Sequence, residues 1–383
     1  MSHFDITRVQ SKAWSLLAGS VASGRVASTY LFCGAEGLGD WPLAVEFAAL
    51  LNCPTPIDER ADGGLMRPCG ECSTCRSIRG LNHESLQIVV PIPKHKNADE
   101  AVDLANAVLA RKREEPFELL DTSSPLSISI EMARQVKKTL SRKGAEGITR
   151  VVVFYQMETM RASSADALLK LIEEPPPDTV LILTTARSEG LLPTIQSRAQ
   201  KIRLERVPEN LAVRYLQEHY QAGDTRARLS ARLSDGNLGR AIELAASDDS
   251  ADSSDRAVGL LLFRTLFTES NPAVIGQAFD LLNPGDRGAL EEMLRLWQTL
   301  IRDCAFYAGT GDEEALINID FVKDVRNISR NFNDSSLAGR LTDTIKNALA
   351  DLRLNVHIQP ALVALLLRLR ADIAAAGASA VQE

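Results

Sequence analysis

The sequence predicts an α/β domain built on a parallel sheet, followed by a wholly helical C-terminal region. Short runs of β-branched or apolar residues alternate with helical patterns or long connections, as is typical of a parallel sheet. These runs are Tyr30–Cys33, Leu86–Val90, Val151–Phe154, Val180–Thr184 and Lys201–Leu204. Two of them contain VVVF and VLIL, and apolar residues at every position are expected of strands covered on both faces. Beyond the last run all patterns are helical.

Length and composition indicate a soluble globular protein with two or three domains. The chain has 383 residues, of which 45% are hydrophobic and 24% are charged. No apolar run reaches the roughly 18–20 residues that span a bilayer, and the N-terminus has no secretion signal. We therefore expect a cytoplasmic protein without a membrane partner. The net charge of −7 argues against wrapping nucleic acid on a broad positive surface.

A glycine-rich turn follows the first predicted strand. Gly34, Gly37 and Gly39 lie between that strand and a helical pattern, as in loops whose backbone N–H groups bind polyphosphate. Such a loop then needs a lysine for the phosphates and a hydroxyl for magnesium. Asp40 and Trp41 hold those positions; an aspartate repels a triphosphate, and an indole does not ligate magnesium. We expect the frame of a nucleotide site without its chemistry.

The residues after the third predicted strand also depart from an ATPase. An ATPase has acidic residues there, one to hold magnesium and one to position or activate the water. This chain continues with Tyr155 and Gln156, and Glu158 comes two positions too late. We expect a surface role for Glu158.

Four of the six cysteines are crowded into a short stretch. They are Cys53, Cys69, Cys72 and Cys75, spaced C-x15-C-x2-C-x2-C. In a chain without signs of secretion this crowding favours a metal over disulfides. Four thiolates can close a tetrahedral zinc site, which leaves no position for water and is therefore structural. A redox CxxC pair is the competing interpretation, and the long gap after Cys53 leaves that ligand the least constrained.

The connection between the second and third predicted strands, about residues 92–125, is long. Asp99–Glu115 within it has a helical pattern with an apolar face. Basic residues flank this helix: Lys94, His95, Lys96, Arg111, Lys112 and Arg113. We interpret it as a solvated surface helix, and a contact to DNA or to a partner protein is the alternative.

Two features close the α/β part and begin the helical part. Ser197 and Arg198 lie in a polar connection before the fifth predicted strand, where a lone arginine is usually solvated or salt-bridged. The acidic run Ser247–Asp255 (SDDSADSSD) suits an exposed linker. The last predicted helix has leucines at i, i+3 and i+4 spacing. These and the isoleucine that follows are Leu362, Leu365, Leu366, Leu369 and Ile373.

Together these residues resemble the bacterial DNA polymerase III clamp-loader ATPase family. The likeness rests on ALLKLIEEPPPDTVLILTT (Ala167–Thr185), on the Ser-Arg pair within TIQSRA, and on a cysteine module after the glycine-loop helix. GNLGRAIEL (Gly236–Leu244) adds Arg240, which matches the family's second-sensor arginine. The likeness covers residues 5 to about 245 and continues more weakly through Asn355 and the run LVALLLRL.

The resemblance is closest to the delta-prime branch, whose loop has Gly-Asp where motor subunits have Gly-Lys-Thr. It implies an AAA+ domain over residues 1–206 with the cysteine module at about 50–80, a helical lid over 207–248, and a helical collar for oligomerisation over 249–383. Three departures are visible: Ala199 stands where the family has cysteine, the gap between Cys53 and Cys69 is longer, and the connection 92–125 is enlarged.

The resemblance also implies a role and partners. We predict a non-hydrolysing subunit that helps load the sliding clamp on primed DNA during replication. Its partners would be gamma/tau-type motor subunits and a delta-type subunit in a pentamer, with the clamp and primer-template DNA reached through the complex. Arg198, with Ser197, would act as an arginine finger in a neighbouring ATP site. The degenerate, inactive nucleotide site would comprise Gly34, Gly37, Gly39, Asp40 and Arg240.

Zinc is the expected cofactor, ATP is not hydrolysed by this chain, and passive binding of a nucleotide stays open. Two other functions compete with this prediction. One is the ATP-hydrolysing gamma/tau-type motor subunit, against which Asp40 argues. The other is an autonomous zinc-containing DNA-binding protein, against which the acidic net charge argues.

Overall fold

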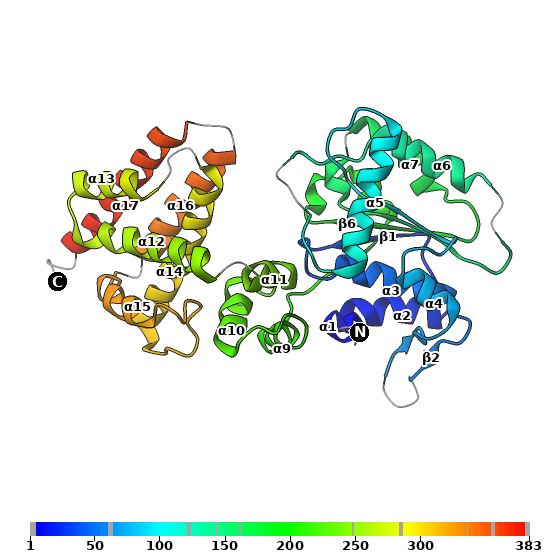
Figure 1. The fold of residues 1–383 in the computed structure, drawn as a ribbon, viewed down its shortest axis with the longest axis horizontal. Helices are drawn as coiled ribbons and strands as arrows, with labels where there is room; N and C mark the ends of the chain where they lie inside the picture. Colours follow the sequence, from blue (N-terminus) through cyan, green and yellow to red (C-terminus); the bar gives the residue numbers. More distant parts are fainter. Residues whose placement is uncertain are drawn as a thin grey trace. The chain divides into compact units, whose positions relative to one another are not determined.

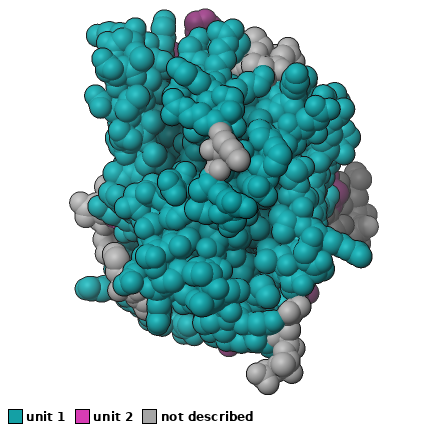
Figure 2. Space-filling view, turned by 90° about the vertical axis from the view of Figure 1, so that its right-hand side faces the viewer, with its two compact units in different colours: residues 1–245 teal, residues 246–383 magenta. Residues whose placement is uncertain are grey.

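The computed structural model describes residues 5–59, 64–120, 124–142, 145–160, 162–246, 249–282, 286–334, 336–353 and 357–379. The chain forms two compact units, residues 1–245 and residues 246–383 (Figures 1 and 2). Asn355, one of the residues on which the family likeness rests, lies outside the described residues.

A five-stranded parallel sheet is the centre of the first unit. Its order is β4-β5-β6-β1-β7, and every pairing within it is parallel. The strands are β1 (Thr29–Cys33), β4 (Leu86–Val89), β5 (Arg150–Phe154), β6 (Thr179–Thr185) and β7 (Gln200–Arg203). Each predicted strand is therefore confirmed, as is the parallel sheet.

Alternate residues of these strands point to opposite faces, and each face carries its own helices (Figure 1). Tyr30 and Phe32 face α2 (Ser11–Ala22) and α3 (Asp40–Asn52), whereas Leu31 belongs to the core on the other side. That second core is covered by α6 (Ile130–Leu140), α7 (Ala162–Glu173) and α8 (Pro193–Arg198). Burying each large side chain contributes about 1.5–3 kcal/mol, which explains why these strands are apolar throughout.

The remaining elements of the first unit lie in its connections. They are α1 (Ile6–Val9), β2 (Ile57–Asp58), β3 (Met66–Arg67), α4 (Ser73–Arg79), α5 (Ala98–Glu114), and the short 3-10 helices η2 (Met157–Thr159) and η3 (Ser188–Gly190). Asn97 begins α5 by accepting a hydrogen bond from the backbone N of Glu100, which satisfies one free N–H of the first turn. The predicted helix in the long connection is confirmed.

Three further helices complete the first unit: α9 (Glu209–Tyr220), α10 (Asp224–Leu233) and α11 (Leu238–Ala246). Tyr215, Leu216 and Leu238 from these helices share a core with α2 and α3. The division into an AAA+ domain and a lid at residues 206/207 stays a prediction.

In its described residues the second unit consists of helices and the connections between them. It contains α12 (Asp249–Thr268), α13 (Asn271–Leu281), α14 (Arg287–Thr310), α15 (Val322–Ile328), η4 (Ser329–Asn331), α16 (Leu337–Arg353) and α17 (Ile358–Ser379). Trp297 is fully buried at the centre, and its Nε1 donates to the carbonyl of Gly259 at 2.8 Å. In α17 the predicted leucines of positions 362 to 369 are buried. None of the helices within the described residues is long and apolar enough to span a membrane.

The linker predicted over Ser247–Asp255 is wrong from Asp249 onward, because α12 begins there. Ser247 and Asp248 lie outside the described residues. Short polar residues lower helix propensity only by a few tenths of a kcal/mol each, so the apolar part of α12, which packs in the core, can extend the helix through them.

Candidate functional site: the glycine loop

The loop has the conformation that its glycines predict. It joins β1 to α3, and Gly37 and Gly39 have φ values of +86° and +107°, in the region that favours glycine. A Cβ atom on Gly39 would lie 2.5 Å from Cδ1 of Ile6, and one on Gly37 would lie 2.4 Å from Oδ1 of Asn237. Gly34 is also closely packed, against Leu204. The three glycines are therefore required by the backbone and by close packing.

Asp40 and Trp41 begin α3 and are both buried, with 4% and 2% of their surface exposed. The Trp41 ring packs edge-on against the ring of Tyr155, with centroids 5.1 Å apart. Burial raises the pKa of Asp40 to about 6, and the nearby ammonium of Lys112 opposes that rise. The Trp41 indole thus packs on a tyrosine of the same chain at the position where a functional loop has its hydroxyl.

The helix α5 is partly or fully exposed along its length, as expected of a surface helix, except at Lys112. A solvated surface helix would expose this residue, but Lys112 is only 2% exposed. Its Nζ donates to the phenol oxygen of Tyr155 at 2.9 Å and to the carbonyl of Glu118, and lies 3.5 Å from Oε1 of Glu36. Burial lowers the pKa of Lys112, and the carboxylates of Glu36 and Asp40 partly offset this effect.

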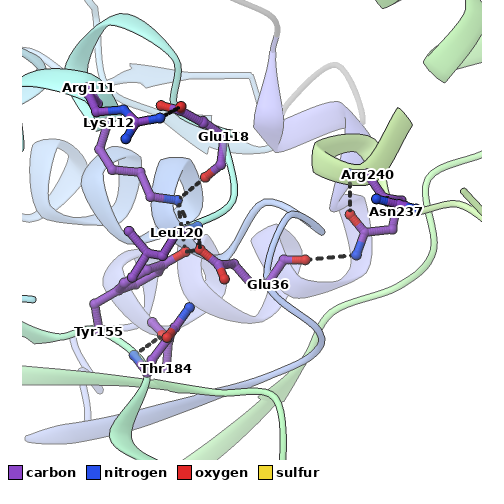
Figure 3. A network of polar contacts seen from close by, with 10 residues as sticks. Glu36, Arg111, Lys112, Glu118, Leu120, Tyr155, Thr184, Asn237 and Arg240 are labelled. Atoms are coloured by element: carbon purple, nitrogen blue, oxygen red, sulfur yellow. Dashed lines mark hydrogen bonds and ion pairs between the residues drawn. The ribbon is translucent and has the colours of Figure 1, made fainter. Parts of the chain in front are cut away.

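Glu36, in the loop itself, is the centre of this polar network (Figure 3). Its Oε1 accepts hydrogen bonds from the Tyr155 hydroxyl at 3.0 Å and from the backbone N of Leu120 at 2.8 Å. Its carbonyl accepts one from Nδ2 of Asn237 at 2.8 Å. Neither the role of Glu36 nor the burial of Lys112 was predicted from the sequence. Lys112 follows Val108 by four positions, on the apolar face of α5, and that spacing was the available signal.

The end of β5 carries Tyr155 and Gln156, as the sequence indicated. Tyr155 is fully buried, and Gln156 has a φ of +55° with its N–H donating to Oγ1 of Thr184 at 3.0 Å. Glu158 is partly buried and does not have the simple surface role expected of it. Its Oε1 accepts from the backbone N of Ala186 at 2.8 Å, so the carboxylate links η2 to the residue after β6.

Arg198 is the last residue of α8 and is partly exposed. One guanidinium nitrogen lies 3.1 Å from Oε1 of Glu173, at the end of α7, and another donates to the carbonyl of Thr194 at 3.3 Å. Ser197 donates to the same carbonyl at 3.1 Å. Arg198 is therefore a salt-bridged surface arginine, and its side chain lies where solvent or another molecule can reach it.

Arg240 lies in the first turn of α11. Its Nη1 forms an ion pair with Oε2 of Glu243 at 3.1 Å, and its backbone N donates to Oδ1 of Asn237 at 3.0 Å. The adjacent N–H of Gly239 donates to the carbonyl of Gly37 at 3.1 Å. The start of α11 is thus hydrogen-bonded directly to the glycine loop.

The four predicted metal ligands come together. The sulfur atoms of Cys53, Cys69, Cys72 and Cys75 all lie within 4.8 Å of one another, and those of Cys69 and Cys75 are 3.9 Å apart. A tetrahedral zinc with Zn–S bonds of about 2.3 Å separates its sulfurs by about 3.8 Å, so the cluster fits this metal.

Backbone N–H groups support these sulfurs. The N–H of Cys72 points to the sulfur of Cys69 at 3.4 Å, and that of Cys75 points to the sulfur of Cys72 at 3.3 Å. N–H groups of Cys72 and Glu71 lower the pKa of Cys69 to about 6. Gly70, with a φ of +79°, makes the tight turn. These N–H groups favour the thiolate form of Cys69, which a metal requires, whereas burial raises the pKa of Cys75.

The profile of the family described as "DNA polymerase III, delta subunit" matches residues 9–208, which is more than half of the chain. The chain belongs to this family. The DNA polymerase III subunit delta' of Bacillus subtilis is 26% identical over 257 residues, which are 67% of this chain and 65% of that protein. The delta' subunit of Pseudomonas aeruginosa is 30% identical over 194 residues, which are 51% of this chain and 47% of that protein.

Other relatives are tau subunits of DNA polymerase III. The tau subunit of Salmonella typhimurium is 27% identical over 241 residues, which are 61% of this delta-family chain but only 31% of that protein. The matches span less than two thirds of the length of these curated relatives. The predicted likeness to the clamp-loader family, and to its delta-prime branch, is confirmed.

Proposed function

We propose that this chain is a non-hydrolysing delta-prime-type subunit of the DNA polymerase III clamp loader, which helps place the sliding clamp on primed DNA during replication. One observation carries the proposal: the loop keeps its glycine conformation, yet a buried Asp40 and a Trp41 packed on Tyr155 stand where a motor subunit needs a lysine and a hydroxyl. The family match supports it.

The proposed architecture is an AAA+ domain over residues 1–206, a lid over 207–248 and a collar over 249–383. The strand order, with β1 between β6 and β7, supports the first assignment because the glycine loop then follows an interior strand of the sheet. The helices α9 to α11 and the helical second unit are compatible with the other two. Structural zinc at the four cysteines belongs to the same proposal.

The proposed complex is a cytoplasmic pentamer with gamma/tau-type subunits and a delta-type subunit, acting on the sliding clamp and primer-template DNA. Arg198 would reach the ATP site of a neighbouring motor subunit, with Ser197 beside it. The exposed position of Arg198 at the end of α8 supports this role, since an arginine supplied to a neighbour has to be accessible.

Copurification tests the role. The tagged chain, expressed at native level, is recovered from lysate of its own organism, and the bound proteins are identified by mass spectrometry. We expect gamma/tau-type and delta-type subunits in stoichiometric amounts that withstand moderate salt. Recovery of the chain alone, under conditions in which the other subunits recover one another, would refute the proposal.

The tau relatives favour a second candidate, the ATP-hydrolysing motor subunit. Turnover of ATP by the purified chain separates the two functions. The delta-prime role predicts no hydrolysis above the blank, whereas a motor role predicts turnover that is lost on mutating the loop.

A further inference from the structure

Three acceptors surround the ammonium group of Lys112. They are the hydroxyl of Tyr155, the carbonyl of Glu118 and the carboxylate of Glu36, and the last of these belongs to the glycine loop (Figure 3). An ammonium has three N–H donors, so this set can satisfy it fully. A functional phosphate loop has a lysine whose positive charge binds the phosphates. Here the positive charge comes from Lys112 of α5, and it is directed at the carboxylate of Glu36.

The segment that follows Lys112 packs against the loop. A Cβ atom on Gly37 would lie 2.7 Å from Cδ2 of Leu119, and one on Gly39 would lie 3.3 Å from Cε1 of Phe117. The N–H of Leu120 donates to Glu36. Phe117 is 3% exposed. Residues 112–120, which we call the plug, therefore contact the loop through a charged group, two apolar side chains and one backbone N–H.

The plug also contacts the helices proposed as the lid. The ring of Phe117 packs edge-on against Tyr215 of α9, with centroids 5.6 Å apart. A Cβ atom on Gly239 of α11 would lie 2.5 Å from the carbonyl oxygen of Phe117 and 2.9 Å from the Cα of Gly37. The loop, the plug and the start of α11 are thus in mutual contact, and the bonds of Asn237 and Gly239 to the loop complete this arrangement.

The charges of this site oppose a polyphosphate. Glu36 and Asp40 are acidic, and Lys112 is already hydrogen-bonded to the first of them. A triphosphate would have to displace Glu36 from Lys112, Tyr155 and Leu120, leaving a carboxylate in a largely buried site without these partners. Removing one partner of a buried charge is strongly unfavourable.

We propose that residues 112–120 of the enlarged connection are an intramolecular plug, which closes the degenerate loop to polyphosphate and fixes α11 to that loop. The plug gives the connection a role. It holds the glycine loop and α11 in one arrangement, as a bound nucleotide would otherwise do. This inference rests on one part of the proposed function, namely that the glycine loop is a former nucleotide site.

Hydrogen exchange of the purified full-length chain tests the plug. Lys112→Met keeps the length and the apolar stem but removes the charge that holds Glu36. We expect exchange at least tenfold faster in peptides covering residues 34–41 and 236–242, with no change in α14, which serves as the internal standard. Arg113→Met, one position further on the same helix and exposed, is the matched control and should leave all these peptides unchanged.

Faster exchange confined to α5, with residues 236–242 unaffected, would overturn the proposed coupling. If Lys112→Met does not fold, Glu36→Gln keeps the acceptor for Leu120 and Tyr155 but removes the ion pair, and the same two peptides are compared. A second arm adds ATPγS and Mg²⁺ to the wild-type chain at millimolar concentration. We expect no protection of residues 34–41, and saturable protection there would refute closure of the loop.

These outcomes are separable from those of the proposed function. The exchange experiment uses the purified chain alone, so its failure removes the plug without affecting copurification with clamp-loader subunits. Conversely, a failure to recover those subunits leaves the exchange result intact.

Discussion

Position 40 shows how an acidic residue can suit the start of a buried helix. Asp40 is the first residue of α3, where a negative charge is favoured by the helix dipole. Its burial is unfavourable for the ionised form, which is why its pKa rises to about 6. The ammonium of Lys112, from α5, opposes this rise in the pKa of Asp40.

Asp40→Asn should flatten the pH dependence of stability. Because the folded pKa of Asp40 is above its unfolded value of 3.8, this group stabilises the fold fully below about pH 4, and the contribution is lost as the pH rises through about 6. Relative to wild type, the free energy of unfolding of the variant should rise by about 1–3 kcal/mol between pH 4 and pH 7. Urea denaturation at several pH values measures it.

Asp103→Asn, on the exposed side of α5, is the control for that series and should follow the wild-type curve. Parallel curves for wild type and Asp40→Asn would contradict the buried, partly protonated carboxylate.

Arg198→Ala should leave the fold intact and lower the DNA-dependent ATPase of the reconstituted clamp loader. The ion pair with Glu173 is partly exposed and contributes at most about 1 kcal/mol, so the melting curve should barely change. Fingers supplied in trans contribute roughly 10³–10⁵ in rate at the site they serve. Arg187→Ala, an exposed arginine after β6, is the matched control. An unchanged rate for the complex with Arg198→Ala would exclude the finger.

At the scale of elements, the strands were predictable because their environment is uniform. VVVF and VLIL are apolar at every position and are buried on both faces, so pattern and burial agree. The prolines from Pro175 onward end α7 as expected, since the helix ends at Glu173. The start of α12 was not predictable, because the propensities of its polar residues are weak compared with the packing of the remaining helix.

Contacts between residues far apart in the sequence could not be predicted, for a different reason. Lys112 and Glu36 are 76 positions apart, and each is an ordinary charged residue in its local pattern. Their pairing depends on how α5 lies over the loop, which no short-range spacing encodes. The cysteines are the opposite case, since three of them lie within seven residues and can find one another locally.

The cysteine module should hold one zinc ion per chain in protein purified without added metal. Cys69→Ser should lower the zinc content and make β2 and β3 more sensitive to protease, because the metal supplies folding free energy to a short segment. Cys33→Ser, outside the cluster, is the control and should retain the metal. Zinc content and thiol titration check this. A metal-free wild type with six reactive thiols would contradict the assignment.

At the scale of the molecule, residues 1–245 and 246–383 have separate hydrophobic cores. The first combines a sheet with helices on both faces, and the second is made of helices around Trp297. The sequence predicted this change of class correctly, because strand patterns stop after residue 204. Stability should therefore divide between the units.

Leu366→Ala should destabilise only residues 246–383. Leu366 is 1% exposed in α17, and removing a buried leucine costs about 2–5 kcal/mol. Calorimetry should show a lower melting temperature for one transition only. The transition of residues 1–245, recognised because a zinc chelator lowers its melting temperature, should not shift. Leu367→Ala is the adjacent control, since Leu367 is 41% exposed. Equal shifts of both transitions would mean that the chain unfolds as one cooperative unit.

The position of β1 in the sheet has a consequence for synthesis. Thr29 pairs with Leu181, about 150 positions later, so the strand that carries the glycine loop has no neighbour until β6 has been made. At roughly 5–20 residues per second this delay lasts about 8–30 s on the ribosome. The four clustered cysteines lie wholly within that interval and can come together early. A nascent chain would thus assemble its cysteine cluster before the sheet that carries the glycine loop.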